Sequence, residues 1–170
     1  MDRSELIAQI PSLRRYARAL TGNAWAADDL VQDTLERACS KWRLWMAGTD
    51  LRAWLFTLMY NLFVSQQRRW ARQPGAGLDG NDAGPELVAP DAALDLSLDL
   101  QRCLMRLPED QRAVLLLASL EDLSYEEIAK VTGVPMGTVM SRLSRARRRL
   151  HELMEGAAGR PTSPALRRLK

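Results

Sequence analysis

Residues 123–150 read LSYEEIAKVTGVPMGTVMSRLSRARRRL and carry the signals of two consecutive helices. Ser124 and Glu127 form a capping box, in which each side chain accepts from the other residue's backbone N–H, so a helix is expected to begin there. Gly133 is suited to the left-handed conformation that ends a helix. Pro135 fits the first turn of the next helix, where a missing N–H has no cost. The stretch therefore predicts a helix-turn-helix.

The second helix of this pair has an apolar and a polar face. Residues at helical spacing form a stripe predicted to be buried, made of Val139, Leu143, Ala146 and Leu150. The opposite face is small and polar at its start and cationic at its end, and it carries Gly137, Ser141, Ser144, Arg145 and Arg148. Such a face fits a DNA major groove, where arginines reach phosphates or guanine edges. An ordinary amphipathic hairpin with a solvated basic face is the alternative.

Composition places the chain among ordinary globular proteins. Its 170 residues suffice for one domain or two small ones, with 46% hydrophobic and 26% charged residues. The net charge of +3 is too small to demonstrate a polyanionic partner. The charges are segregated, however, because arginines crowd the C-terminal end and acidic residues cluster over residues 28–36. This segregation suggests different partners for the two ends.

Metal, cofactor and membrane signals are missing from the sequence. Cys39, Cys103 and the sole histidine, His151, have no metal-ligand spacing and form no nucleophile pair, so we expect no metal, no cofactor and no enzymatic activity. Each cysteine is interpreted as a small buried hydrophobe, in a protein of the reducing cytoplasm. Early charges and the lack of a long apolar run predict neither a signal peptide nor membrane insertion.

Helical periodicity predicts three helices in the first part of the chain, over residues 5–20, 25–42 and 51–70. Pro11 interrupts the first of these, and we interpret it as the point where the continuous part of that helix begins. The inward stripe predicted for the second helix consists of Val31, Leu35, Ala38 and Trp42.

Acidic residues dominate the outer face of the second helix. Asp28 and Asp29 suit the helix dipole at its start, whereas Asp33 and Glu36 lie further in, where the dipole has less effect. Either these acidic residues only stabilise the helix through its dipole, or their face docks on a basic surface of a partner.

The third helix is apolar on two sides. One side carries Leu51, Leu55, Leu58 and Leu62, and the other carries Phe56, Tyr60 and Phe63. Apolar residues all round predict burial among other helices. The helix ends in SQQRRW, residues 65–70, and this mixture of amide, arginine and aromatic side chains also suits single-stranded nucleic acid, which needs stacking faces and cations. From the sequence both interpretations stay open.

Between residues 73 and 91 the composition changes sharply, because four glycines and three prolines exclude a helix and a core. We predict a flexible linker there, with helical periodicity resuming after it and no strand pattern anywhere. The prediction is an all-α protein of two small bundles, with domains at residues 1–72 and 93–155, a linker at 73–92 and a disordered basic tail at 156–170.

Three blocks of this chain resemble bacterial RNA polymerase sigma factors of the extracytoplasmic-function class, the compact type with only the second and fourth conserved sigma regions. They are LTGN with DDLVQDT at residues 20–23 and 28–34, LRAWL at 51–55, and residues 123–149. Their order around a linker makes the resemblance specific, and it covers nearly all of residues 13–153 outside that linker. The run GTDLRAWLFT, residues 48–57, is also similar to the general-stress-response subgroup.

The resemblance implies a transcription initiation factor with three sites. Docking on core RNA polymerase would use Asp28, Asp29, Val31, Gln32, Asp33 and Glu36. Capture of the melted minus-ten element of promoter DNA would use Tyr60, Asn61, Ser65, Gln66, Gln67, Arg68 and Arg69. Recognition of the minus-thirty-five element would use Pro135, Gly137, Thr138, Met140, Ser141, Ser144, Arg145 and Arg148. An anti-sigma factor that covers the apolar docking surfaces is a further expected partner.

Two positions depart from the family pattern. Met140 stands where the family usually has Arg or Lys, which removes a phosphate or base contact, and Ser65 replaces the Asp common before the arginine pair.

We expect the free protein to bind DNA weakly, because a flexible linker lets both DNA sites engage only when polymerase sets their spacing.

Two other classes of function fit parts of the sequence. An autonomous helix-turn-helix regulator would use its first bundle to dimerise or bind a ligand and would recognise a palindrome. That role leaves the acidic face and the aromatic-arginine helix without a purpose. A nuclease needs converging carboxylates around metal ions, whereas Asp28, Asp29 and Asp33 lie on a surface helix without a nearby histidine.

Overall fold

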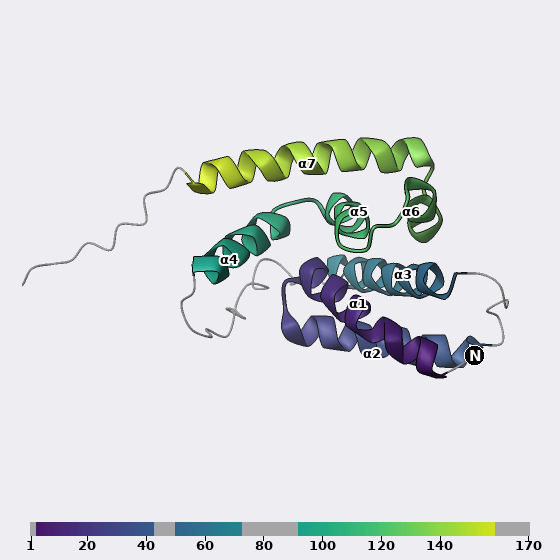
Figure 1. The fold of residues 1–170 in the computed structure, drawn as a ribbon. Coiled ribbons are helices and arrows are strands. Elements are labelled where there is room, and N and C mark those ends of the chain that lie inside the picture. The colour runs from purple at the N-terminus through teal and green to yellow at the C-terminus, as the bar shows by residue number, and fades with distance from the viewer. Residues whose placement is uncertain (1–2, 43–49, 73–91, 159–170) are drawn as a thin grey trace, which may run out of the picture.

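The computed structural model describes residues 3–42, 50–72 and 92–158, and every regular element in these ranges is a helix (Figure 1). The elements are α1 (Arg3–Thr21), α2 (Ala24–Ser40), α3 (Leu51–Ala71), α4 (Ala92–Met105), α5 (Glu109–Ser119), α6 (Tyr125–Thr132) and α7 (Met136–Ala158). The predicted all-α fold is confirmed. The predicted linker lies outside the described residues except for Ala92, which is already helical.

Helices α1, α2 and α3 pack around a common core. Leu13, Leu30 and Met59, one from each helix, are fully buried. A tight turn at Gly22, with φ +67°, joins α1 to α2, and Asn23 caps α2 by accepting from the N–H of Ala26 at 3.0 Å. The sequence suggested that the continuous part of the first helix begins at Pro11. In the structure Pro11 instead lies inside α1, with about two helical turns before it.

Helices α4 to α7 form the second group, and α6 and α7 are the predicted helix-turn-helix. The capping box is confirmed, because the Ser124 N–H donates to Glu127 Oε2 at 2.7 Å and the Glu127 N–H donates to Ser124 Oγ at 3.3 Å. Gly133 ends α6 in the left-handed conformation, with φ +69°. The predicted stripe of α7 faces inward, with Val139, Leu143 and Ala146 buried and Leu150 half-buried.

The ends of α7 differ by a few residues from the prediction. Pro135 precedes the helix rather than opening it, and its carbonyl accepts from the N–H groups of Thr138 and Val139. The helix also continues through Gly156 to Ala158, so the first residues of the predicted tail are helical. One glycine costs only about 1 kcal/mol in a helix, and the alanines after it favour helix.

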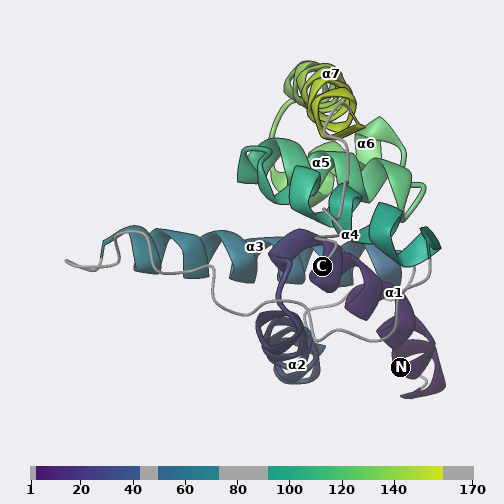
Figure 2. The same cartoon turned by 90° about the vertical axis from the view of Figure 1, so that its left-hand side faces the viewer.

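The two groups of helices pack directly on each other (Figure 2). Helix α1 contacts α4 and α5, while α3 contacts α6. Phe56 and Tyr60 of α3 are therefore buried although they lie on the side opposite its leucines, and Phe56 meets the ring of Tyr16 edge-on with centroids 5.3 Å apart. Burial between two layers explains why α3 is apolar all round, which confirms the first of the two interpretations for these side chains.

Replacing the capping carboxylate by Glu127→Ala should lower the free energy of unfolding by about 1 kcal/mol at neutral pH. Hydrogen bonds from Ser124 hold the pKa of Glu127 below its ordinary value. A depressed pKa in the folded state contributes stability above the unfolded value, and that contribution is lost as the pH falls through the folded pKa. The difference from wild type should therefore vanish in acid. Urea unfolding at several pH values measures it, with Glu126→Ala, the exposed neighbour in the same turn, as the control expected to match wild type.

Candidate nucleic-acid and partner interfaces

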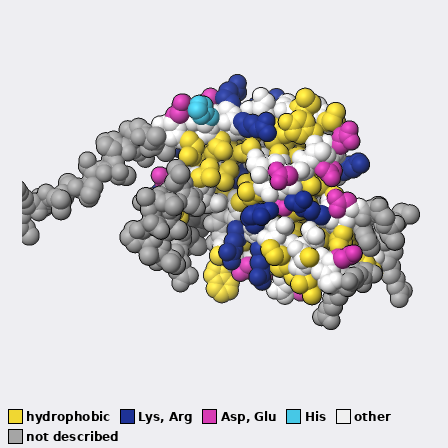
Figure 3. All heavy atoms as spheres, in the orientation of Figure 1, with side chains coloured by type: hydrophobic (Ala, Val, Ile, Leu, Met, Phe, Trp, Pro, Cys, Tyr) yellow, Lys and Arg dark blue, Asp and Glu magenta, His cyan; other side chains and the backbone are white. Residues whose placement is uncertain are grey.

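The outer face of α7 carries the residues predicted to read duplex DNA. Of these, Thr138 and Ser141 are half-buried, and the exposed ones are Pro135, Gly137, Met140, Ser144, Arg145 and Arg148. Ser141 Oγ donates to the Thr138 carbonyl at 3.0 Å. Helix α7 lies along one edge of the molecule, and Lys and Arg side chains are visible on that edge (Figure 3). The face is therefore open to a ligand and cationic, as a helix entering a major groove requires.

An exposed methionine pair adds an apolar component to this face. Met136 and Met140 are 47% and 50% exposed and lie one helical turn apart. Met140 was predicted from the sequence to belong to this face and Met136 was not, although its spacing of four residues from Met140 was the available signal. Such a pair can make apolar contact with the methyl group of thymine.

Helix α2, which carries the acidic face, lies on the far side of the molecule from α7 (Figure 1). Asp28, Asp29, Gln32 and Glu36 are exposed, and Asp33 is half-buried. Val31 is only 4% exposed and belongs to the core, so the structure does not place it on the docking face. Position 31 follows Leu30 on the inward stripe of α2, which is wide enough to bury both residues.

The electrostatics of this face favour a cationic partner. Partial burial raises the pKa of Asp33, and the neighbouring carboxylates of Asp29 and Glu36 raise it further, while Arg69 opposes them. A positive charge docking here would relieve the repulsion among the three carboxylates. Trp25, at the start of the same helix, is 86% exposed and extends the face with an aromatic side chain that was not predicted to be part of it.

The C-terminal half of α3 carries the predicted minus-ten residues. Asn61, Ser65, Arg68 and Arg69 are exposed, Gln66 and Gln67 are half-buried, and Tyr60 is buried. Tyr60 is therefore not presented to a ligand, because the second layer of helices covers that side of α3. Ser65 Oγ donates to the Asn61 carbonyl at 2.8 Å, and Gln66 Nε2 donates to Asp33 Oδ2 at 3.4 Å. The last bond brings the predicted minus-ten and polymerase sites together.

A cavity of about 320 Å³ separates this half of α3 from the start of α5. Tyr60, Gln67 and Arg68 line one side, while Glu109 and Asp110 line the other. Asp110 also accepts from Nε of Arg142 in α7 at 3.1 Å. The two carboxylates of α5 therefore stand beside side chains predicted to bind DNA.

Glu121 joins the two layers of helices. Its side chain is fully buried and accepts from Arg15 Nη2 at 2.9 Å and from Arg52 Nη2 at 2.7 Å, so two arginines from α1 and α3 bind one carboxylate. The same two guanidinium groups donate to the carbonyls of Leu120 at 2.9 Å and Glu121 at 2.7 Å. We call Glu121, Arg15 and Arg52 the clasp. Nothing in the local sequence around Glu121 distinguishes it from an exposed loop residue.

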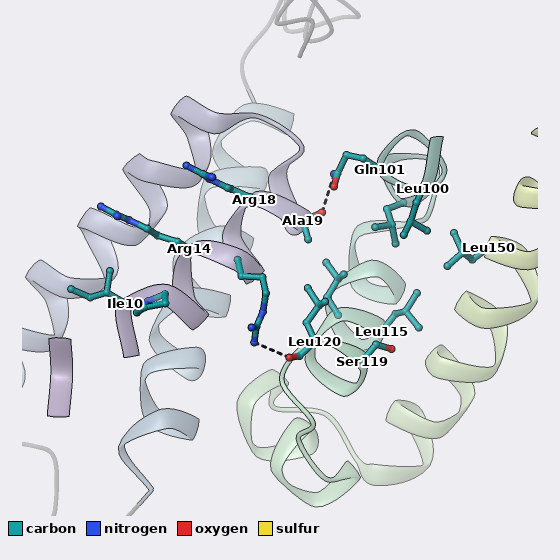
Figure 4. Close-up of a pocket in the computed structure, with 14 residues that line it drawn as sticks. Ile10, Arg14, Arg18, Ala19, Leu100, Gln101, Leu115, Ser119, Leu120 and Leu150 are labelled. Atoms are coloured by element: carbon teal, nitrogen blue, oxygen red, sulfur yellow. Dashed lines mark hydrogen bonds between the residues drawn. The ribbon is translucent and has the colours of Figure 1, made fainter. Parts of the chain in front are cut away.

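A groove of about 770 Å³ lies between the layers (Figure 4). Helix α1 lines one wall, where Ile10, Arg14 and Arg18 follow one another along the helix. The facing wall comes from α4, α5 and α7 and is apolar, with Leu100, Leu115, Leu120 and Leu150. An apolar floor with a basic edge fits an amphipathic helix that carries acidic residues.

Two further findings concern the described residues. None of their helices has the length and apolar character needed to cross a membrane. They also hold no cluster of three or more His, Cys, Asp or Glu side chains suited to a metal ion.

Cys103 is buried, as expected, but Cys39 is exposed, which corrects the interpretation of that residue as a buried hydrophobe.

Family models match both layers of the protein. Residues 6–60 match the sigma2 domain of PhyR, and residues 97–150 match sigma-70 region 4. The ECF RNA polymerase sigma factor EcfG of Rhodopseudomonas palustris (strain TIE-1) is 40% identical over 153 residues, covering 89% of this chain and 84% of the relative.

Solved structures extend the similarity to the arrangement of the helices. The sigma factor RpoE of Bartonella quintana, in complex with the anti-sigma factor NepR, matches with a TM-score of 0.77 and 39% identity over 90% of this chain and 96% of that one. CnrH in complex with the cytosolic domain of CnrY matches with a TM-score of 0.68 and 25% identity over 90% and 87% of the two chains.

Proposed function

The chain belongs to the extracytoplasmic-function class of RNA polymerase sigma factors, and we propose that it assigns promoter recognition to three separate faces of its fold. As a sigma factor it is a transcription initiation factor that directs core RNA polymerase to promoters. The observation that carries the proposed assignment is the placement of an exposed basic face on α7, in one layer, and an exposed acidic face on α2, in the other layer. Opposite charges on separate layers suit a protein that binds both DNA and a basic protein surface.

Each face has a proposed ligand. The acidic residues of α2 dock on core polymerase, with Trp25 as an added aromatic contact. The exposed residues at the end of α3 hold the single-stranded minus-ten element, where Arg68 and Arg69 bind phosphates and Asn61 contacts a base. The outer face of α7 reads the minus-thirty-five element in the major groove, through Arg145 and Arg148 to phosphates or guanine and through the methionine pair to thymine.

The groove between the layers is the proposed seat of an anti-sigma factor. The similar sigma factor RpoE is in complex with the anti-sigma factor NepR, and the similar CnrH is in complex with the cytosolic domain of CnrY. An amphipathic helix of the anti-sigma factor would place apolar residues against Leu100, Leu115 and Leu150 and acidic residues against Arg14 and Arg18. The match to EcfG and to the PhyR domain supports a role in the general stress response.

Two further properties, the lack of enzymatic activity and the cellular location, are part of the same proposal. We expect the chain to have no enzymatic activity of its own, since its role is to place polymerase on DNA. We also expect it to act in the cytoplasm, where core polymerase and promoter DNA are found.

Reconstituted transcription tests this function. Wild-type protein mixed with core RNA polymerase and genomic DNA fragments should give run-off transcripts whose start sites share two sequence elements. The variant Arg145→Ala, Arg148→Ala should still bind polymerase, but promoter-specific transcripts should fall at least about tenfold, and the salt dependence of promoter binding should weaken by about two phosphate contacts.

The control for this experiment is Arg14→Ala, an exposed arginine of α1 outside the three faces assigned above, which should transcribe as wild type does. A folded wild-type protein that binds no polymerase and instead protects a palindrome by itself would replace the sigma-factor assignment with the autonomous regulator.

A further inference from the structure

We propose that the clasp holds the free protein in a closed state that cannot read a promoter. Its three side chains join the layers at one point, with Arg15 from α1 and Arg52 from α3 on one side and Glu121, between α5 and α6, on the other. Opening the clasp is then a required step of promoter recognition. Closure itself is independent of the proposed function, whereas its effect on DNA rests on that function.

The burial of Glu121 is what makes the contact a clasp. Its side chain has no exposed surface, and both of its oxygens are bound by guanidinium groups from the other layer. A buried carboxylate that loses such partners carries a large desolvation penalty unless it returns to water. In the described structure it returns to water only if the layers separate. The ion pairs therefore decide between the closed and open arrangements.

Further contacts across the interface accompany the clasp. Tyr16 Oη donates to the Ala113 carbonyl at 3.3 Å, and Gln101 Nε2 donates to the Ala19 carbonyl at 3.3 Å. Met105 of α4 lies against Gly22, where a side chain larger than hydrogen would collide with its sulfur. These neutral contacts add complementarity, but none of them buries a charge.

The closed arrangement is too compact for a promoter. Helix α6 contacts both α3 and α7, so the two DNA-reading helices are separated by the thickness of a single helix, roughly 20 Å between axes. The minus-thirty-five and minus-ten elements are about 25 base pairs apart, or roughly 85 Å of duplex. One closed molecule therefore cannot contact both elements.

Closure also opposes DNA at the minus-ten site. Glu109 and Asp110 share the small cavity with Gln67 and Arg68, so two carboxylates stand where DNA phosphates would approach α3. Repulsion between these carboxylates and phosphates adds to the obstruction by the second layer. Separation of the layers removes both obstacles at once.

Double electron–electron resonance on the full chain, which measures the distance between two spin labels, tests the closed state. One spin label is attached to the exposed native Cys39 of α2 and the other to Arg149→Cys on α7, in a Cys103→Ala background. Wild type should give one narrow distance distribution. The variant Arg15→Ala, Arg52→Ala should broaden it and lengthen the mean distance by at least about 10 Å, the spacing of one helix layer. The matched control, Arg14→Ala with Arg18→Ala, loses the same charge from arginines outside the clasp and should keep the wild-type distribution.

A second variant, Glu121→Gln, changes the clasp from the other side with little change in size and should lengthen the distance as well. A broad, long distribution in wild type, or a narrow one in both clasp variants, would overturn the proposal. Adding core polymerase to wild type should also lengthen the distance. If polymerase does not bind, the proposed function fails while the result for the clasp stands.

Discussion

The variant Asp29→Arg, Asp33→Arg should lose its affinity for core RNA polymerase by about 100-fold or more, because two carboxylates that would face basic groups become like charges. Asp29 is exposed and Asp33 half-buried on α2, so both substitutions act on the surface rather than in the core. Asp33 is also repelled by Asp29 and Glu36, and its removal relieves that repulsion. Folding should therefore be preserved. A pull-down with purified core polymerase, quantified over a range of protein concentrations, measures the loss.

A matched control separates this effect from net charge. Glu5→Arg with Glu155→Arg makes the same change in charge on exposed residues of α1 and α7, away from α2. This control should bind polymerase as wild type does. Equal binding by the α2 variant and wild type would show that polymerase docks elsewhere, and equal loss in both variants would show that only overall charge matters.

Local signals in the sequence predicted the helix-turn-helix well. The capping box, the left-handed glycine and the apolar stripe of α7 each depend on residues within a few positions of one another, and all three are present in the structure. Exposure along α2 and α3 was predicted less well. Val31 was assigned both to the inward stripe and, through the resemblance, to the docking face, and Tyr60 was assigned to the minus-ten site, yet both are buried, because a family motif does not specify which of its members face the core.

The contacts between the layers could not be predicted in the same way. Arg15 and Glu121 are 106 positions apart, and Arg52 and Glu121 are 69 apart. No periodicity within one helix refers to a residue so distant. The apolar second side of α3 was the one local signal of a covering layer, and it was equally compatible with nucleic acid. The groove exists only where α1 meets α4, α5 and α7, so it too depends on tertiary packing.

Arg112 is another residue that only the structure explains. It lies in α5, is buried, and points its Nη1 at the carbonyls of Leu104 and Met105, both at 3.4 Å, and of Leu107 at 3.3 Å. Leu104 and Met105 form the end of α4 and Leu107 follows it, at the helix terminus where carbonyls lack the partners of a regular helix. Burial lowers the pKa of Arg112 and the carboxylate of Glu109 opposes this, but an arginine remains charged at any ordinary pH. A cation at the end of α4 also complements its dipole.

Replacing this side chain by Arg112→Ala should lower the free energy of unfolding by about 3 kcal/mol, because buried carbonyls lose their donor and the stem of the arginine leaves a hole. Arg112→Lys keeps the charge but has a single ammonium group, so its loss should be smaller but distinct from zero. Arg106→Ala removes an exposed arginine nearby and should change the free energy by no more than about 0.5 kcal/mol. Urea unfolding followed by circular dichroism ranks the three variants. If Arg112→Ala unfolds at the same urea concentration as Arg106→Ala, the carbonyls of residues 104–107 must be satisfied by water, and α4 would owe its position to apolar packing alone.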